Sequence, residues 1–270
     1  MKKLFKKILI VALLMVAFTS CEEDDIESGH GTLTVKLTDA PFPFDYVTEA
    51  NIGVAKIELK NAVGEYIIVF EGNSNFNMVG LTNGVTKNVV NTNIKEGTYS
   101  NARITLNAAS AKLSNGTSFD MNAEAHESYT ISINPALEIK EGSNSEVLFD
   151  LDISDSFEFT GIWIGNWVPN VASILGCHFN AHFRACDLNK TGKIEGHVTV
   201  SGNALENAYV YILVNGEEIS TQTEANGSFT FIGVADGSYT VSVKTETNGT
   251  KSVSNVKVNG TETAICTLDL

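Results

Sequence analysis

Residues 177–186 combine the side chains best suited to metal binding or thiol chemistry. Cys177, His178, His182 and Cys186 are all ligand types that a structural zinc ion accepts. Read as one strand, the segment places Cys177 on one face and the other three side chains on the opposite face. One strand cannot easily close four ligands around one ion. The alternatives are a Cys177–Cys186 disulfide and two separate thiols, and the redox state of the compartment decides between them. Cys266 has no cysteine partner in either case, and we expect it to be a buried free thiol in the last strand.

A second candidate is an aromatic stripe at strand spacing. Its members share one parity, so they face the same side of an extended chain: Phe157, Phe159, Trp163 and Trp167. An exposed stripe could stack on sugar rings, which makes Trp163 and Trp167 candidate ligand-stacking residues. The isoleucines between the tryptophans, Ile162 and Ile164, make the opposite face apolar too. Burial of the stripe in a core is therefore the favoured interpretation, and a stacking platform is the alternative.

Three carboxylates follow one another closely at Asp150, Asp152 and Asp155. Carboxylate oxygens suit calcium, but the spacing lacks the glycine-containing ligand ladder of an EF-hand. The alternative is an outward, solvated strand face. We expect no metal site here.

The sequence contains none of the common catalytic motifs that we sought. The chain has no Gly-x-Ser-x-Gly elbow, no His-Glu-x-x-His pair and no phosphate-binding loop, and His126 and His197 each stand alone. We therefore predict a protein that is not an enzyme, with no catalytic residues and no cofactor.

The N-terminus predicts export. Lys2, Lys3, Lys6 and Lys7 precede an apolar run over residues 8–18, which is too short to span a membrane, since a span needs about 20 apolar residues. This pattern is typical of a secretory signal peptide, which we place at residues 1–20. Export to an oxidising compartment favours the Cys177–Cys186 disulfide.

The segment Phe-Thr-Ser-Cys at residues 18–21 resembles the lipobox of bacterial lipoproteins. Phe18 stands where leucine is usual, and this loose form resembles the lipoboxes of Bacteroidota. The resemblance implies that Cys21 is the lipidation site and carries several acyl chains. Two or more chains anchor a protein stably, so the membrane is an expected partner through Cys21.

Residues 21–30 are expected to form an acidic tether, because residues 22–25 are all Glu or Asp and no apolar period follows them. A mere solvated spacer is one interpretation. Acidic runs after the lipidated cysteine also resemble the signal that sends Bacteroidota lipoproteins to the exterior face of the outer membrane. We therefore predict an outer-membrane lipoprotein that faces the cell exterior.

Net charge excludes one class of partner. The chain has 18 basic and 32 acidic residues, and loss of the four lysines in residues 1–20 brings the net charge from −14 to about −18. A phosphate backbone would be repelled by such a chain, so nucleic acid is not an expected partner.

Turn dipeptides and short strands predict an all-β fold. Asn-Gly recurs along the chain, for example at residues 83–84, 115–116 and 226–227, and no long amphipathic helix occurs. In the first strand Leu33, Val35 and Leu37 alternate with polar residues, and the parity slip between Val54 and Ile57 predicts a bulge or break. We expect two β-sandwich domains in tandem, over residues 31–187 and 192–270.

The first unit carries three motifs in order: Thr-Asp-Ala-Pro at residues 38–41, the Gly-Thr-Tyr turn at 97–99 and the acidic strand at 146–152. Together they resemble a domain family of unknown function, DUF4382, that is common in bacterial lipoproteins. The resemblance implies a β-sandwich-like fold and supplies no catalytic residues.

The second unit carries an ordered set of small, β-branched and aromatic residues: Gly196, Val198, Ala208, Val210, Thr223, Gly227, Phe229, Phe231, Gly237 and Tyr239. These residues and their order resemble the carboxypeptidase-regulatory-like domain. The resemblance implies a non-catalytic, seven-stranded Greek-key sandwich of the transthyretin or starch-binding-like type.

These features together predict a lipid-anchored binding or structural module at the cell surface. One alternative is a glycan-binding accessory lipoprotein of a polysaccharide-uptake system. Another is an adhesin or assembly subunit that pairs with other surface proteins.

Overall fold

The computed structural model describes residues 29–42, 46–122, 127–161, 171–214, 216–245 and 249–270. Cys21, His126, Trp163 and Trp167 lie outside these ranges, as do the predicted signal peptide and nearly all of the predicted tether. Within the described ranges, no helix is long and apolar enough to cross a membrane.

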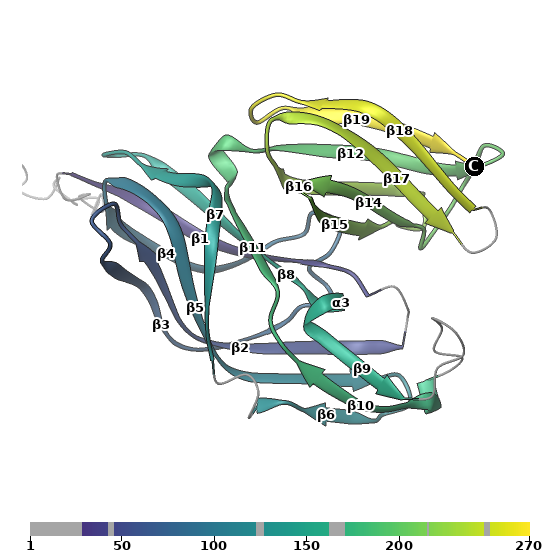
Figure 1. Cartoon of the computed structure of the whole chain (residues 1–270), viewed down its shortest axis with the longest axis horizontal. Helices are drawn as coiled ribbons and strands as arrows, with labels where there is room; N and C mark the ends of the chain where they lie inside the picture. Colours follow the sequence, from purple (N-terminus) through teal and green to yellow (C-terminus); the bar gives the residue numbers. More distant parts are fainter. Residues whose placement is uncertain (1–28, 43–45, 123–126, 162–170, 215, 246–248) are drawn as a thin grey trace, which may run out of the picture.

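The predicted all-β fold is confirmed, and the strands fall into two modules (Figure 1). We call β1 to β11 the N-terminal module and β12 to β19 the C-terminal module. The last strand of the first, β11, ends at Asp187, and β12 begins at Gly192.

One large sheet builds the N-terminal module. Across this nine-stranded sheet, counted over the described residues, the order is β3 (Tyr66–Asn77), β2 (Val47–Lys60), β5 (Gly97–Leu113), β7 (Ser128–Ile139), β11 (Phe183–Asp187), β8 (Asn144–Asp152), β1 (His30–Ala40) and β4 (Lys87–Lys95), with β6 (Ser118–Asp120) beside β5.

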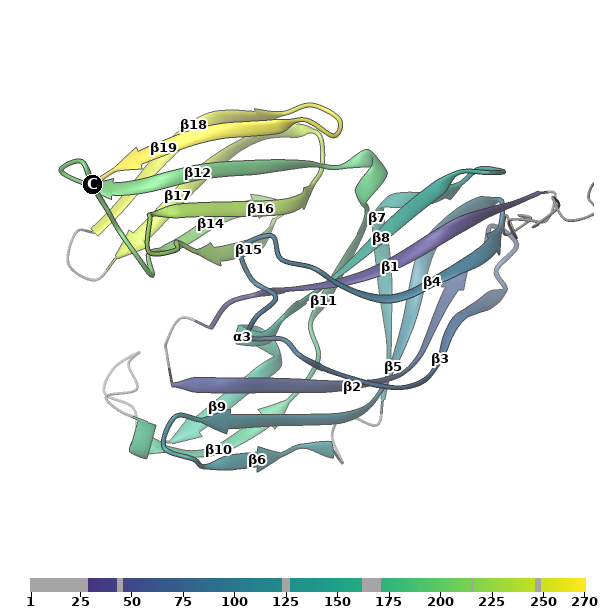
Figure 2. The same ribbon diagram turned by 180° about the vertical axis from the view of Figure 1, so that it is seen from behind.

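The large sheet folds back on itself at β7. This strand pairs along much of its length with β5, but it meets β11 only through Ile133 and Ala185. The strands on the two sides of β7 therefore form two layers, and both layers contribute to one core (Figure 2). The inward residues of β1, Leu33, Val35 and Leu37, are fully buried there, as their alternation predicts.

The parity slip in β2 is a bulge, as predicted. The register of β2 shifts between Val54 and Lys56 against both of its neighbours, β3 and β5. This shift lets Val54 and Ile57, three residues apart, both point into the core.

A short ribbon of β9 (Phe157–Gly161) and β10 (Ile174–Phe179) covers one end of the core, after the single-turn helix α3 (Ile153–Ser156). Phe157 and Phe159 are buried, and both lie against Phe42. The described half of the aromatic stripe therefore belongs to the core, as favoured from the sequence.

The C-terminal module is a sandwich of two sheets. Within the described residues, one sheet has β13 (Asn203–Ala204), β12 (Gly192–Val200) and β16 (Ser228–Val234) in order, with β19 (Thr263–Asp269) parallel to β12. The other has β15 (Glu217–Gln222), β14 (Tyr209–Val214), β17 (Gly237–Thr245) and β18 (Gly249–Val258). Apart from the two-residue β13, these are the seven strands expected for this sandwich.

Candidate functional site

The two modules are joined by a packed contact that centres on Arg184 of β11. Its Nε donates to Oδ2 of Asp150 at 2.8 Å, and Nη2 lies 2.7 Å from the same oxygen. Its guanidinium also donates across the boundary, to the carbonyl oxygens of Ile232 and Gly233, both at 3.0 Å. Arg184 thus binds a carboxylate of its own module and the backbone of the other module at once.

Apolar packing surrounds this contact. Leu148 and Cys186 of the N-terminal module form a buried cluster with Ile232 of the C-terminal module. Gly233 has a positive φ of 66°, and a Cβ there would lie 2.7 Å from Sγ of Cys186. The close approach therefore depends on a glycine at that point.

Polar contacts elsewhere fix the same boundary. The Asn83 side chain donates to Glu224 at 2.8 Å and accepts from the backbone N–H of Thr230 at 2.6 Å. Gln222 donates to the carbonyl oxygen of Phe42 at 2.9 Å. Asn83 has the positive φ, 55°, that its Asn-Gly turn predicts. Its role as a contact between modules has no signal in the sequence.

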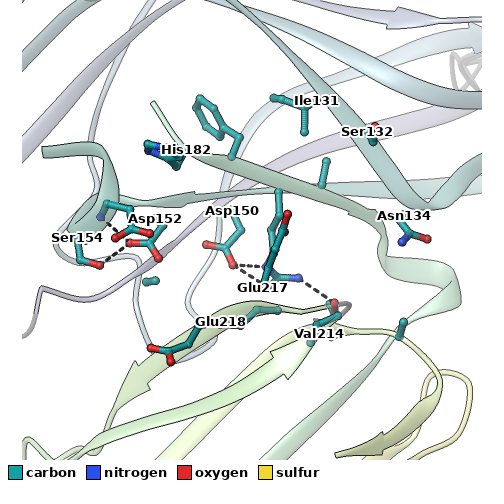
Figure 3. Close-up of a pocket in the computed structure, with 18 of the residues that line it drawn as sticks. Ile131, Ser132, Asn134, Asp150, Asp152, Ser154, His182, Val214, Glu217 and Glu218 are labelled. Carbon is teal, nitrogen blue, oxygen red and sulfur yellow. Dashed lines mark hydrogen bonds and ion pairs between the residues drawn. The ribbon is translucent and has the colours of Figure 1, made fainter. Parts of the chain in front are cut away.

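A cleft of about 630 Å³ opens beside this contact, between the two modules (Figure 3). Its floor comes from β8 and β11, and its opposite wall comes from β14, β15 and the end of β16. The ionisable side chains that line it are mostly carboxylates: Asp150, Asp152, Asp155, Glu217 and Glu218, with Tyr209, His182 and Arg184.

Strand alternation explains the acidic floor. In β8 the side chains of Val147, Phe149 and Leu151 enter the sandwich core, so Asp150 and Asp152 must point the other way. One interpretation of these aspartates from the sequence is that they lie on an outward, solvated strand face. Their face does point out of the sandwich, but the C-terminal module covers it, so Asp150 is buried.

Burial shapes the acidity of the floor. Loss of hydration raises the pKa of Asp150, and the neighbouring Arg184 opposes that shift. Burial also raises the pKa of Asp152, against hydrogen bonds from Ser154 and Asp155. Among the described residues, Oδ1 of Asp150 is a buried carboxylate oxygen without a hydrogen-bond partner.

Asp39 of β1 is another buried acid, near the aspartates of the floor. Its Oδ1 accepts from the backbone N–H of Ile153 at 3.1 Å, whereas the described part of the chain offers Oδ2 no hydrogen-bond partner. Burial raises its pKa well above the ordinary value, and the nearby charges of Asp150 and Asp152 raise it further.

This raised pKa predicts a pH-dependent effect of Asp39→Asn. At a pH between the pKa of Asp39 in the unfolded chain, about 4, and its raised pKa in the folded state, only the folded state keeps the proton of this carboxyl group. The free energy of unfolding of the wild type therefore falls as pH rises through this window. The amide is neutral throughout and keeps an acceptor for Ile153. Its free energy of unfolding, relative to the wild type, should rise with pH above about 4 in denaturant titrations.

Asp269→Asn is a control for which the stability difference from the wild type should change with pH in the opposite direction. Hydrogen bonds from Thr199 and Gly202 lower the pKa of Asp269, so its contribution is present at neutral pH and is lost as pH falls through its lowered folded pKa. That variant should therefore be less stable than the wild type at neutral pH and approach it in acid. A relative stability of Asp39→Asn that stays constant between pH 4 and 8 would contradict the assigned burial of Asp39.

The aspartates do not assemble a metal site in the described part of the chain. Oδ1 of Asp152 accepts from the Ser154 hydroxyl at 2.6 Å and from the Asp155 backbone N–H at 3.1 Å, which caps α3. No group of three or more His, Cys, Asp or Glu side chains in the described ranges is placed to hold a metal ion. The calcium alternative therefore has no support from the geometry.

The predicted Cys177–Cys186 disulfide is wrong, because Cys186 is a free thiol. Residues 177–186 are not one strand: the chain leaves the ribbon after Phe179 and enters the large sheet at Phe183. Cys186 is thereby buried against the C-terminal module, and burial raises the pKa of its thiol. Cys266 is a buried free thiol, as predicted, and burial raises its pKa to about 11.

The two histidines of this segment also separate. His178 is exposed on the ribbon, and His182 lines the cleft. Sequence reasoning missed Arg184, Glu217 and Glu218 as parts of one site. The two glutamates directly follow another Asn-Gly dipeptide, at residues 215–216, and a turn signal does not indicate which residues the next side chains face.

Comparison with known protein families divides the chain as the strands do. Residues 30–162 match the domain of unknown function DUF4382, and residues 193–270 match the carboxypeptidase regulatory-like domain. Matches to both domain families are therefore found in the predicted order. No curated protein matches the chain significantly.

Solved structures give only a distant likeness. The Bacillus anthracis TIE protein aligns with 97% of this chain at 10% identity and a TM-score of 0.26, and the chain spans 44% of that protein's length. BcpA, the major pilin subunit of Bacillus cereus, aligns with 89% of this chain over 99% of its own, at 10% identity and a TM-score of 0.22. GBS52, the minor pilin of Streptococcus agalactiae, aligns with 87% of this chain over 94% of its own, at 7% identity and a TM-score of 0.25.

Proposed function

We propose that the protein is a non-catalytic binding module whose ligand lies in the cleft between its two modules. In this proposal, acyl chains on Cys21 hold it on the outer membrane, and the acidic tether after Cys21 displays it on the cell exterior. The observation that carries the proposal is the 630 Å³ cleft, which has the volume of a small-molecule site and the interdomain position that such sites favour.

The contacts around Arg184 support a preformed site. Hydrogen bonds from Arg184 to backbone carbonyl oxygens, apolar packing and further side-chain hydrogen bonds join the modules at several points beside the cleft. A cleft whose walls are already fixed loses little conformational entropy when a ligand binds.

The position of the cleft suits display away from the membrane. The predicted tether joins β1 at His30, and Ala40 at the other end of the same strand lines the cleft. An 11-residue strand is about 33 Å long at about 3.3 Å per residue. The strand therefore places the cleft about 33 Å from the residue at which the predicted tether joins the fold.

A variant that fills the cleft tests the proposal. Ser132 is exposed on β7 and lines the cleft, so tryptophan at this position would occupy ligand space without entering the core. Thermal-shift screening against glycans, peptides and organic cations identifies a binder, and the Kd of that binder is then measured. Ser132→Trp should weaken binding at least about tenfold, because tenfold corresponds to the loss of only about 1.4 kcal/mol.

Ser128→Trp is the matched control. Ser128 lies on the same strand with the same parity and is also exposed, but it does not line the cleft. Its Kd should equal that of the wild type. Equal affinity of both variants for a verified binder would contradict the cleft as the site. A glycan whose binding is lost in Trp163→Ala or Trp167→Ala, but kept in Ser132→Trp, would support the glycan-binding alternative instead.

A further inference from the structure

The charge and the lining of the cleft indicate a ligand class that no family match supplies. We propose that the cleft binds a linear organic cation with two or more ammonium groups, of the polyamine class. This inference rests on the proposed function, because it assigns the ligand of the same cleft.

The cleft carries far more negative than positive charge. Five carboxylates line it: Asp150, Asp152, Asp155, Glu217 and Glu218. Arg184 is the arginine of the lining, and its guanidinium is already occupied by Asp150 and by two carbonyl oxygens of the C-terminal module. An anionic or uronic ligand would meet uncompensated repulsion here, whereas a cation would be attracted.

A second observation, independent of the net charge, is a buried carboxylate oxygen of Asp150 that lacks a hydrogen-bond donor among the described residues. Asp150 is only 7% exposed, and its Oδ1 has no hydrogen-bond partner among the described residues, although the side chain lies at the cleft floor (Figure 3). A buried carboxylate oxygen without a partner is costly, and an ammonium donor that approaches through the floor would satisfy it.

The carboxylates lie on two sides of the cleft, the floor and the opposite wall. Asp150 and Asp152 come from β8 of the N-terminal module, and Glu217 and Glu218 come from β15 across the cleft. A compact metal ion would need three or more of these ligands at one point, and the described residues provide no such group. Ammonium groups separated along a chain can instead pair with both sides.

Apolar residues also contribute to the lining of the cleft. Ile131, Phe183, Val214 and Ile219 also line the cleft. Such a surface suits the methylene segments that join the ammonium groups of a polyamine, because transfer of methylene groups from water to apolar surroundings is favourable. A lining that offers carboxylates on two sides together with apolar residues matches a linear polyamine in charge and in chemistry.

Calorimetric titration of the purified protein with spermidine tests this inference. The double variant Glu217→Gln with Glu218→Gln keeps the size of both exposed side chains and removes two charges from one wall. It should raise the Kd for spermidine at least tenfold. The matched control, Glu206→Gln with Glu262→Gln, removes two exposed charges of the same module that do not line the cleft, and it should leave Kd within twofold.

Saturable 1:1 binding with this contrast between the two double variants would support the inference. Absence of saturable binding at millimolar spermidine would overturn it, and so would an equal loss in both double variants, which would show unspecific attraction to an acidic surface. A neutral ligand whose binding is blocked by Ser132→Trp but unchanged by the Glu217 and Glu218 substitutions would overturn the polyamine assignment while leaving the cleft as the binding site.

Discussion

Arg184→Ala should lower the free energy of unfolding by about 3–5 kcal/mol, which is the usual effect of removing one partner of a buried ion pair. The Asp150 side chain is 9% exposed and would be left as an uncompensated buried carboxylate. The carbonyl oxygens of Ile232 and Gly233 would lose their donors at the same time. The modules should then separate more easily, and the cleft between them should lose its fixed walls.

Denaturant unfolding followed by circular dichroism measures this loss. Lys112→Ala removes a cation that pairs with Glu49 at 3.0 Å, but both of those side chains are more than 40% exposed, so its effect should be far smaller. Adding Asp150→Leu to Arg184→Ala should recover part of the stability, because the unpaired buried charge is removed. A loss for Arg184→Ala as small as that for Lys112→Ala would contradict the role of Arg184 as the link between the modules.

Phe149→Ala should lower the free energy of unfolding by about 3–5 kcal/mol, the usual effect of truncating a phenylalanine in a core. Phe149 lies on β8, directly before Asp150, and its ring is fully buried between the layers of the N-terminal module. The truncation removes apolar contacts and leaves a cavity around which the structure relaxes only partly. The same denaturant titration measures the effect.

Leu175→Ala is the surface control, because Leu175 on β10 is 69% exposed. A change at such a site should stay within about 0.5 kcal/mol. A similarly small effect of Phe149→Ala would show that β8 is paired one residue out of register. Such a shift would exchange the faces of Phe149 and Asp150, and it would move Asp150 out of the cleft.

Local chemistry in the sequence determined the strands and their inward faces. The alternation of Leu33, Val35 and Leu37 predicted the buried face of β1, because successive side chains of a strand point to opposite sides. The slip between Val54 and Ile57 predicted the bulge for the same reason. Asn83 and Gly84 predicted a positive-φ turn, since few residue types adopt that conformation easily. Each of these signals is contained within a few neighbouring residues.

The site depended on pairings between residues far apart in the chain, which only the tertiary structure decided. The segment 177–186 was expected to be one strand with a disulfide, but pairing with two different sheets divides it. Asp150 and Arg184 are 34 residues apart, and Gly233 lies 49 residues beyond Arg184. Periodicity shows that Asp150 points away from its own core, but it does not show what covers it. Because the C-terminal module packs against that face, the outward carboxylates of β8 line the floor of a cleft.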